Sequence, residues 1–573
     1  MTKTAGALVL AFALAVATPA PAAEHVPAEA AIAAAHPAAT AAGRVILDRG
    51  GNAFDAAVAV AAALAVAEPY SSGLGGGGFL LLHRARDGKD VVIDAREKAP
   101  QAASRDMYLD AKGEFVATRS LNGALAAAIP GLPAGLVLLS RHYGRLPLAD
   151  SLAPAIELAE QGFAVTKHYQ MMAGFRAGVL KADAEAGRLF LHEGAAPEAG
   201  TTIVQRDLGA TLRKLAASGQ AGFYAGPVAK KLVDGVRAAG GIWTLEDLQA
   251  YRAVERVPLA GTYHGIRIVS APPPSSGGVV LLEALNILEP YAVEHLDAAG
   301  RRHVVIEAMR RAYRDRAAYL GDPDFVEVPV GKLTAKPYAA ELAKSIDEEH
   351  ATPSSALPAV GAASPQGPHT THFSVLDTEG NRVAATLSIN YPFGAAVVPP
   401  GTGVLLNDEM DDFSARPATP NGYGLVGDEA NAIAPGKRPL SSMTPTFLEA
   451  PDRIGVLGTP GGSRIVSMVL LGALEFAARK PPADWVGAPR YHHQYLPDEV
   501  QFEQGGLDEA AQADLKRRGH ALKPVDRRYG NMQAILWSLT NGEVSAASDP
   551  RGEGESAVWK PHLASKRLKR AAP

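Results

Sequence analysis

Apolar runs and helix-breaking residues in the first part of the chain predict two successive helices. An Ala-rich apolar run covers residues 53–67 and is stopped by a Glu-Pro pair. Another helix is expected over about 38–48, because the glycine pair at residues 50–51 ends it. Asn52 follows that pair and can accept hydrogen bonds from the first free amides of the second helix. The pattern predicts a short, buried, N-capped helix.

The middle of the chain shows a hairpin and then a long stretch without a strand pattern. Apolar runs at residues 79–82 and 91–93 flank a charged turn, which predicts a β-hairpin. Residues 135–342 are interpreted as helical, with Gly and Pro breaks. The segment PPPSSGG at residues 272–278 interrupts this region and is either a linker or a buried structural turn.

The character of the chain changes just before residue 370. Residues 351–368 are small, Pro-rich and nearly uncharged, which is typical of an exposed, flexible loop. Residues 372–376 and 382–389 then have strand composition and are separated by the turn DTEG. A second hairpin is therefore expected, directly after the loop.

The turn of this second hairpin sets its register. If it centres on Glu379, the numbers of paired residues sum to about 758, which places Ser388 opposite Thr370. Asn390 then lies just beyond, on the same face as Ser388. A hydroxyl at residue 388 could hydrogen-bond and tune the side chain of Thr370.

The N-terminus has the pattern of an export signal. Lys3 gives a positive start, residues 5–17 form an apolar core, and residues 20–22 (APA) give a small-x-small cleavage pattern. We expect a signal peptide over residues 1–22 and a periplasmic or secreted location; the alternative is an Ala-rich first helix. No later segment reaches about 18 uninterrupted apolar residues, so no membrane span is expected.

Composition and charge narrow the classes of function. The chain has 573 residues, 47% hydrophobic and 20% charged, with a formal net charge of -4, as expected of an ordinary globular protein. No basic run is long enough to predict a nucleic-acid partner. The sequence has no cysteine, which excludes disulfides, a lipid-anchoring thiol and a cysteine nucleophile.

Two local motifs suggest a cofactor or a metal, but each has a better structural explanation. Residues 73–78 (GLGGGG) match the dinucleotide pattern GxGxxG, yet they follow a helix and precede an apolar run, the reverse of that motif's context. They are interpreted as a tight structural turn. His492 and His493 are adjacent and point in different directions on a helix or a strand, so they are interpreted as core residues. We expect no metal and no cofactor.

Thr370 is the candidate nucleophile. A threonine hydroxyl needs a base, and an N-terminal threonine has one in its own α-amine, which titrates at about 7.7–8.0. Freeing that amine requires cleavage between His369 and Thr370, through attack of the Thr370 hydroxyl on the carbonyl of His369. The alternative is that the Thr-Thr pair merely opens a strand, as β-branched residues do well.

The segment TTHFSV at residues 370–375 resembles the start of the small subunit of γ-glutamyltransferase, an N-terminal-nucleophile hydrolase. The resemblance covers nearly the whole mature chain, in the family's order. The other matching segments are GGNAFDAA (50–57), residues 71–79, REKAP (96–100), PPPSSGG (272–278), LNDEMDDF (406–413), KRPLSSM (437–443), residues 458–464 and ASDPR (547–551).

The resemblance implies an α+β fold, the four-layer αββα sandwich, with two stacked antiparallel sheets between helical layers. It implies a large subunit over residues 23–369 and a small catalytic subunit over residues 370–573, which stay together as a heterodimer. Thr370 would attack the γ-glutamyl amide of a donor such as glutathione, and water or an amine acceptor would resolve the acyl-enzyme.

The resemblance also implies which residues recognise the two charges of a glutamyl group. The carboxylate-binding residues are Arg96, Ser441 and Ser442, and the ammonium-binding residues are Asn390, Glu409 and Asp412. Gly461 and Gly462 would offer backbone N–H groups to the oxyanion. Two departures from the family are Ser388, where many members have threonine, and the bulky pair Tyr391-Pro392.

Two alternatives accompany this interpretation. A cephalosporin or glutaryl-amide acylase has the same fold, but its substrates lack an α-ammonium, so Asp412 would have no task. Residues 420–438 also resemble the family's lid loop, with Tyr423 as its closing side chain, and acylase-type relatives tend to lack it. The other alternative is a non-enzymatic periplasmic protein that binds glutamyl compounds and stays a single chain.

Overall fold

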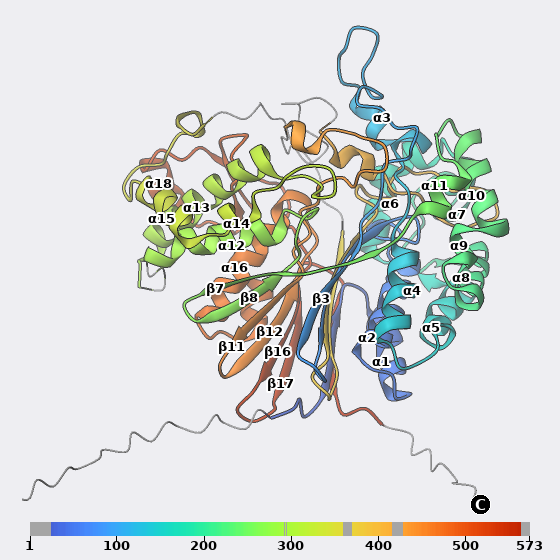
Figure 1. Ribbon diagram of the computed structural model, residues 1–573, viewed down its shortest axis with the longest axis horizontal. Coiled ribbons are helices and arrows are strands. Elements are labelled where there is room, and N and C mark those ends of the chain that lie inside the picture. Colours follow the sequence, from blue (N-terminus) through green and yellow to red (C-terminus); the bar gives the residue numbers. More distant parts are fainter. Residues whose placement is uncertain (1–24, 292, 294, 359–369, 415–427, 563–573) are drawn as a thin grey trace, which may run out of the picture.

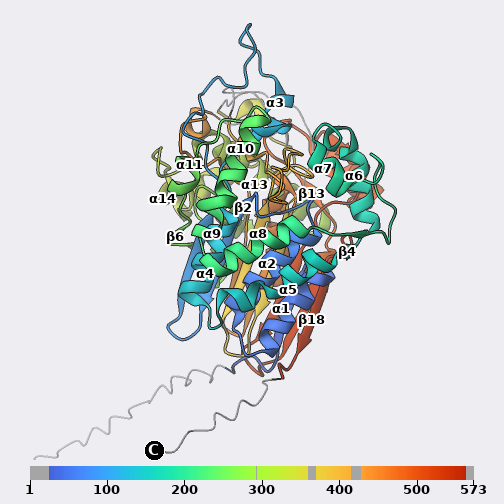
Figure 2. The same cartoon turned by 90° about the vertical axis from the view of Figure 1, so that its right-hand side faces the viewer.

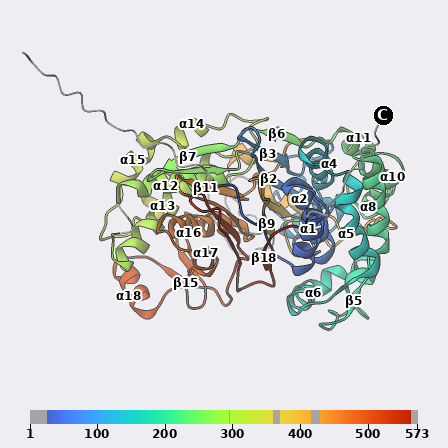
Figure 3. The same ribbon diagram turned by 90° about the horizontal axis from the view of Figure 1, so that it is seen from below.

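Two β-sheets lie face to face at the centre of the molecule, and helices cover the outer face of each (Figure 1). The structure is a computed structural model that describes residues 25–291, 293, 295–358, 370–414 and 428–562. Seen from below, the layers follow one another as helices, sheet, sheet and helices (Figure 3). The predicted four-layer αββα sandwich is therefore confirmed.

Both sheets are antiparallel and combine strands from before and after residue 370. The seven-stranded sheet has the order β18 (Glu555–Trp559), β1 (Ala30–Ala34), β9 (Thr371–Leu376), β10 (Arg382–Ser388), β2 (Gly77–Arg84), β3 (Lys89–Ala95) and β6 (Val254–Arg256). The six-stranded sheet has the order β17 (Val544–Ser548), β16 (Gln533–Ser538), β12 (Arg453–Gly458), β11 (Thr446–Ala450), β8 (Ile266–Ser270) and β7 (Leu259–Tyr263).

One helical layer covers each sheet. On the seven-stranded side, which faces the viewer in Figure 2, lie α1 (Pro37–Asp48), α2 (Ala53–Ala67), α4 (Leu132–Tyr143), α5 (Leu148–Gln161) and α8 (Arg206–Ser218). On the six-stranded side lie α12 (Gly277–Leu288), α13 (Ala298–Tyr319), α15 (Lys336–Lys344), α16 (Ile465–Ala477) and α18 (Glu509–Arg517).

The described chain has further α-helices and strands outside these four layers or at their edges. They are α3 (Ala117–Leu121), α6 (Lys167–Leu180), α7 (Ala184–Phe190), α9 (Ala221–Tyr224), α10 (Gly226–Ala238), α11 (Leu245–Ala250), α14 (Val330–Leu333), α17 (Pro482–Gly487), β4 (Phe163–Ala164), β5 (Thr202–Ile203), β13 (Tyr491–His492), β14 (Val500–Phe502) and β15 (Leu522–Pro524). In this part of the chain, no helix combines the length and the hydropathy needed to cross a bilayer.

Strand β2 shows how the layers are joined. Phe79 and Leu81 belong to the same buried cluster as Val456 of β12, in the layer between the two sheets. The alternate residues Leu80 and Leu82 belong to the large cluster that includes α2. Because side chains alternate along a strand, one strand fills both apolar layers. The predicted hairpin is confirmed, since β2 and β3 pair antiparallel.

Helix α2 begins and ends as the sequence predicts. Asn52 Oδ1 accepts from the N–H groups of Phe54 and Asp55, and Asp55 Oδ2 accepts from the N–H of Asn52. This capping box satisfies amides that the helix itself leaves free. Every residue of α2 is buried, as expected of a helix that is apolar on all sides.

The prediction of a helical region over residues 135–342 is wrong for one part of it. Residues 254–256, 259–263 and 266–270 form β6, β7 and β8. Burial alternates at the start of β8, where Ile266 and Ile268 are buried around a partly exposed Arg267. β-branched residues with this alternation favour a strand, and the Pro and Gly breaks between them are turns.

The loop before Thr370 is only partly described. Residues 351–358 are mostly exposed or half-buried and carry a short 3-10 turn at Ser354–Ala356. The rest of the predicted loop, the cleavage residue His369 and the predicted signal peptide at residues 1–22 lie outside the described residues.

Candidate active site

Thr370 directly precedes β9 and is buried, with 7% of its surface exposed. β9 pairs with β10 so that Leu387 lies opposite Thr371, which confirms the predicted register and places Ser388 opposite Thr370. Thr370 Oγ1 and Ser388 Oγ are 3.4 Å apart. Ser388 Oγ accepts from the N–H of Asn390 at 2.7 Å, so its own proton can be donated towards Thr370.

Gly461 and Gly462 lie in the turn between β12 and α16. Their φ angles are 148° and 56°, values that favour glycine. Gly462 begins a 3-10 turn, Gly462–Arg464, that leads directly into α16. Gly461 lines one pocket with Thr370, and Gly462 lines another with Thr370. The predicted oxyanion-binding glycines therefore lie beside the candidate nucleophile, where a helix N-terminus also favours negative charge.

The smaller of these two pockets gathers the predicted recognition residues. It is lined by Arg96, Thr370, Ser388, Asn390, Glu409, Asp412, Ser441, Ser442, Met443, Gly462, Ser463 and Ile465. These residues come from segments more than 300 positions apart, on both sides of residue 370. Tyr423, the predicted closing side chain, lies outside the described residues.

The guanidinium of Arg96 is the centre of this pocket. It is fully buried and forms ion pairs with Glu97, Glu409 and Asp412, while its Nε donates to the carbonyl of Pro439 at 3.1 Å. Burial alone would lower the pKa of Arg96, but the attraction of Glu409, Asp412 and Glu97 outweighs it and raises that pKa above its ordinary value. Arg96 is therefore a permanent cation.

The acidic groups around Arg96 are not equally charged. Burial raises the pKa of Glu97 to about 7, and burial raises the pKa of Glu409 well above its ordinary range. Repulsion from neighbouring carboxylates, Asp412 among them, acts in the same direction. An arriving ammonium would favour the charged forms of these carboxylates, so the pocket can adjust its charge to a zwitterion.

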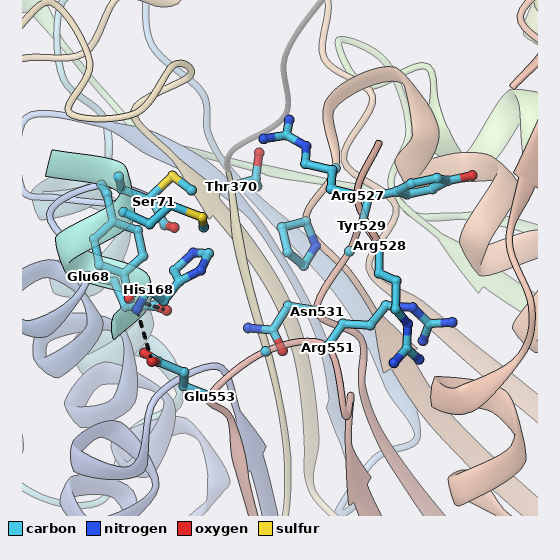
Figure 4. Close-up of a pocket in the computed structure, with 17 residues that line it drawn as sticks. Glu68, Ser71, His168, Thr370, Arg527, Arg528, Tyr529, Asn531, Arg551 and Glu553 are labelled. Atoms are coloured by element: carbon cyan, nitrogen blue, oxygen red, sulfur yellow. Dashed lines mark hydrogen bonds between the residues drawn. The ribbon is translucent and has the colours of Figure 1, made fainter. Parts of the chain in front are cut away.

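Thr370 also lines a larger cleft of about 180 Å³ (Figure 4). Glu68, Ser71, His168 and Glu553 lie on one wall. Arg527, Arg528, Tyr529, Asn531 and Arg551 lie on the opposite wall. One wall therefore carries carboxylates and the other carries guanidinium groups.

The arginines of the cleft differ in what they already bind. Arg551 is held by Glu503 and Asp549 and has a structural task. Arg527 and Arg528 are exposed and form no hydrogen bond or ion pair with other described residues. Arg527 extends towards Thr370 (Figure 4), and its charge lowers the pKa of His168 across the cleft, in addition to the larger effect of burial.

Glu68 connects the acidic wall to the nucleophile's strand. Its Oε2 accepts from the hydroxyl of Thr371 at 2.7 Å. Burial raises the pKa of this carboxyl to about 7. The sequence identified Glu68 only as part of a helix stop, and it gave no signal for Arg527; neither belongs to a recognisable motif.

The structural explanations of the two motifs set aside in the sequence are confirmed. A Cβ at Gly76 would lie 2.0 Å from the carbonyl oxygen of Ser388, so the glycine run packs backbone against backbone beside the hairpin. His492 and His493 are fully buried and hydrogen-bonded, to Ser467 and to Asp498 among others.

One group of described residues has the spacing of a metal site, namely His83, Asp90 and Glu449. The guanidinium of Arg267 pairs with both carboxylates, at 2.7 Å from Asp90 Oδ2. The group is thus an ion-pair network between the two sheets, and neither candidate pocket includes it.

A threonine at the start of a central strand, in a four-layer αββα sandwich, defines the class of N-terminal-nucleophile hydrolases. A family model described as Gamma-glutamyltranspeptidase matches residues 39–559. The chain belongs to the γ-glutamyltranspeptidase family. It is therefore an enzyme, which sets aside the alternative of a binding protein without catalytic activity.

The chain is also similar to individual proteins with known names or structures. The chain is 43% identical over 521 residues to the glutathione hydrolase proenzyme of Escherichia coli (strain K12), covering 90% of this chain and 89% of the relative. The solved cephalosporin acylase from Bacillus halodurans is similar with a TM-score of 0.81 and 31% identity, over 96% of this chain and 99% of that one. The solved Helicobacter pylori gamma-glutamyltranspeptidase is similar with a TM-score of 0.55 and 40% identity, over 56% of this chain and 93% of that one.

Proposed function

We propose that the protein cleaves its own chain before Thr370 and then uses Thr370 to transfer γ-glutamyl groups from amides such as glutathione. The observation that carries this proposal is the small pocket that Thr370 lines together with a buried cation, two carboxylates and the serines at residues 441 and 442. A γ-glutamyl group carries an α-carboxylate and an α-ammonium beside its amide, so one substrate explains all of these groups.

In the proposed self-cleavage, the hydroxyl of Thr370 is the attacking group. Oγ1 attacks the carbonyl carbon of His369, the peptide nitrogen leaves as the new α-amine of Thr370, and water hydrolyses the resulting ester. The relative from Escherichia coli is named a proenzyme, which supports such a step in this chain. The products would be a large subunit over residues 23–369 and a small subunit over residues 370–573, held together as a heterodimer.

Catalysis then follows two half-reactions. The freed α-amine accepts the proton of Oγ1, which attacks the γ-carbonyl carbon. The N–H groups of Gly461 and Gly462 stabilise the oxyanion, and the leaving amine takes up the proton. Water or an acceptor amine attacks the acyl-enzyme in the second half-reaction. Ser388 Oγ lies 3.4 Å from the Thr370 oxygen, and in this mechanism it donates a hydrogen bond that holds the oxygen in place.

Binding of the glutamyl group requires a local opening. The small pocket has only about 20 Å³, roughly the space of one water molecule. Asp412 pairs with Arg96 and keeps 14% of its side chain exposed, whereas Glu409 is buried. We infer that Asp412 moves from Arg96 to the incoming ammonium, and that Arg96 then binds the carboxylate.

The alternative function is that of an acylase with the same fold. The similarity to a cephalosporin acylase supports this alternative. A glutaryl amide has no ammonium, so it would give Asp412 and Glu409 no positively charged group of the substrate to bind. The greater identity to a glutathione hydrolase proenzyme also favours γ-glutamyl substrates.

The larger cleft is suited to bind the amine that leaves in the first half-reaction and the acceptor amine that enters in the second. Thr370 lines this cleft, and Arg96 does not. An amino acid or a peptide is a zwitterion at neutral pH, and the cleft has one acidic and one basic wall. We infer that Arg527 binds the carboxylate of such an acceptor, whose amine then faces Thr370.

The N-terminal pattern supports a further proposal, that residues 1–22 export the protein to the periplasm or the medium. The proposed reaction uses the α-amine of Thr370 as its base and therefore has no step that needs a metal or a cofactor.

The proposed activity predicts both the form of the protein and its substrate preference. Purified protein should give two bands on a denaturing gel, with the smaller chain starting at Thr370 by N-terminal sequencing. It should hydrolyse a γ-glutamyl anilide at least about 10-fold faster than the glutaryl anilide, because hydrogen bonds to a charged group contribute about 1.5–3 kcal/mol. A single intact band, or equal rates on both anilides, would contradict the proposal.

Arg527→Gln tests the acceptor cleft. The variant should lower transfer to a dipeptide acceptor about 10-fold, because a charge-assisted hydrogen bond to the carboxylate is lost. Transfer to the same dipeptide with a C-terminal amide, and hydrolysis, should change little. The measurement is the ratio of transfer to hydrolysis with each acceptor.

Arg517→Gln is the matched control, because Arg517 is an exposed arginine of α18 that pairs with Asp514 outside the cleft. It should leave both ratios unchanged. Equal effects of Arg527→Gln on the dipeptide and on its amide would show that Arg527 does not bind a carboxylate.

A further inference from the structure

Arg316, in helix α13, is a buried guanidinium that lies behind the small pocket. Only 5% of its surface is exposed. Its Nε donates to Ser276 Oγ at 3.0 Å, and its Nη2 donates to Ser442 Oγ at 3.2 Å. Ser442 lines the small pocket beside Arg96. Arg316 therefore touches one of the pocket's walls from the outside.

No described carboxylate lies within ion-pair distance of Arg316. Arg310 and Arg311, on the same helix and as deeply buried, both pair with Glu307. The neighbouring Asp315 accepts from Arg314 and Tyr338 instead. Burying a cation without a counter-ion costs free energy. A buried arginine without an ion pair is therefore explained best if an anion, such as a bound substrate, comes close to it. One of its two hydrogen-bond partners, Ser442, lines the small pocket, so an anion bound there would lie near Arg316.

The direction of the hydrogen bonds gives Arg316 a specific effect on Ser442. A guanidinium can only donate, so Ser442 Oγ is the acceptor and its own proton must point elsewhere. That proton has no acceptor among the described residues. Ser441 is arranged in the same way, since its Oγ accepts from the N–H of Met443 at 3.1 Å. Both hydroxyls therefore present a donor to the pocket.

The segment PPPSSGG fixes the backbone that carries these serines. The N–H and the hydroxyl of Ser276 donate to the carbonyl of Ser441, at 2.8 and 2.7 Å. Ser275 Oγ donates to the carbonyl of Met443 at 2.6 Å, and the N–H of Ser441 donates to the carbonyl of Pro274. Arg316 binds Ser276 and Ser442 together, so it links this turn to the pocket wall.

We propose that Arg316 is a positioning residue for carboxylate recognition, which orients the Ser442 hydroxyl towards the substrate and places a second positive charge behind it. This inference rests on the proposed function, in which Arg96, Ser441 and Ser442 bind the α-carboxylate. The substrate carboxylate then adds a negative charge near Arg316, which forms no ion pair with a described carboxylate. Arg96 contacts that carboxylate directly, and Arg316 acts through Ser442.

The charge state of Arg316 is compatible with this role. Burial lowers its pKa to about 10, while Tyr313 and Asp412 act in the opposite direction. Arg316 is therefore protonated at neutral pH. Asp412, which attracts Arg316, is also the residue that we expect to bind the ammonium. The charge of Arg316 is therefore coupled to both charged groups of the glutamyl substrate.

The test compares two anilides that differ only in the carboxylate, γ-glutamyl anilide and 4-aminobutyryl anilide, with the full cleaved enzyme. Arg316→Met should lower kcat/KM for the γ-glutamyl substrate about 10- to 100-fold, mainly through KM, as expected for loss of support to a charged group. For the 4-aminobutyryl substrate the loss should be less than about threefold. Arg316→Lys keeps the charge but cannot bridge both hydroxyls, so its loss should be intermediate.

The ratio of the two kcat/KM values does not depend on how much enzyme is correctly folded. If Arg316→Met yields no cleaved protein, the ratio for Arg316→Lys decides, and an unchanged ratio overturns the inference. Equal losses on both substrates would also overturn it, since they indicate a purely structural role. Arg302→Met, near the start of the same helix, is the control and should leave both values unchanged.

The wild-type enzyme separates this inference from the proposed function. If the wild type turns over both anilides equally well, recognition of the α-carboxylate is itself wrong. If the wild type prefers the γ-glutamyl anilide and Arg316→Met keeps that preference, only the role of Arg316 is wrong.

Discussion

Thr370→Ala is expected to remain a single uncut chain, close to the 59.6 kDa of the full sequence, and to lose its activity. The methyl group of alanine cannot attack the carbonyl of His369, so no α-amine is freed and no acyl-enzyme forms. Removal of a catalytic nucleophile lowers kcat by about 10⁴-fold or more. A denaturing gel and a γ-glutamyl anilide assay measure both effects.

Thr370→Ser is the matched control because it keeps the hydroxyl and loses only a methyl group. It should be cleaved, although more slowly, and should keep measurable activity. Thr371→Ser, whose hydroxyl can still reach Glu68, should be cleaved and active. Cleavage of Thr370→Ala between residues 369 and 370 would show that another group breaks the chain, and the assignment of the nucleophile would be wrong.

Asp412→Asn is expected to give the second largest loss, with kcat/KM for γ-glutamyl substrates reduced about 10- to 100-fold, mainly through KM. The amide has nearly the size of the carboxylate but cannot pair with the ammonium. It also releases one of the anions that hold Arg96. Steady-state kinetics on γ-glutamyl and glutaryl anilides separate the two effects, because only the first substrate has an ammonium.

The loss on the glutaryl anilide should be much smaller than the loss on the γ-glutamyl anilide. Glu429→Gln is the control, since Glu429 is an exposed carboxylate that pairs with Arg105 and lines neither pocket. An equal loss of activity on both anilides would mean that Asp412 acts only by holding Arg96, and the argument for ammonium recognition would be lost.

The sequence predicts those parts of the structure that local physics determines. The turn DTEG fixes the pairing of β9 with β10, so the position of Ser388 opposite Thr370 follows from counting. Asn52 and the apolar run after it determine both ends of α2. The sandwich itself and the recognition residues come from the resemblance to a family, because contacts such as Arg96 with Asp412 join positions 316 apart.

Other features could not be predicted, for identifiable reasons. Strands β6 to β8 have only three to five residues each and lie in a region of the chain that is otherwise mostly helical, so their alternating pattern is weak. Arg316 is one of several arginines in α13, and only the packing of that helix against Ser276 and Ser442 distinguishes it. Arg527 lies in an exposed segment whose relation to Thr370 depends on the whole chain.

The strand order of the large sheet determines whether the two pieces could separate after cleavage. β1 lies between β9 and β18, with backbone hydrogen bonds to both, so a strand from before residue 370 is enclosed by two from after it. In the smaller sheet β8 pairs with β11 across the same divide. If the chain is cut as proposed, the two pieces have no separable interface, and their dissociation would amount to unfolding. The cut would therefore free an amine without creating an assembly that dilution could take apart.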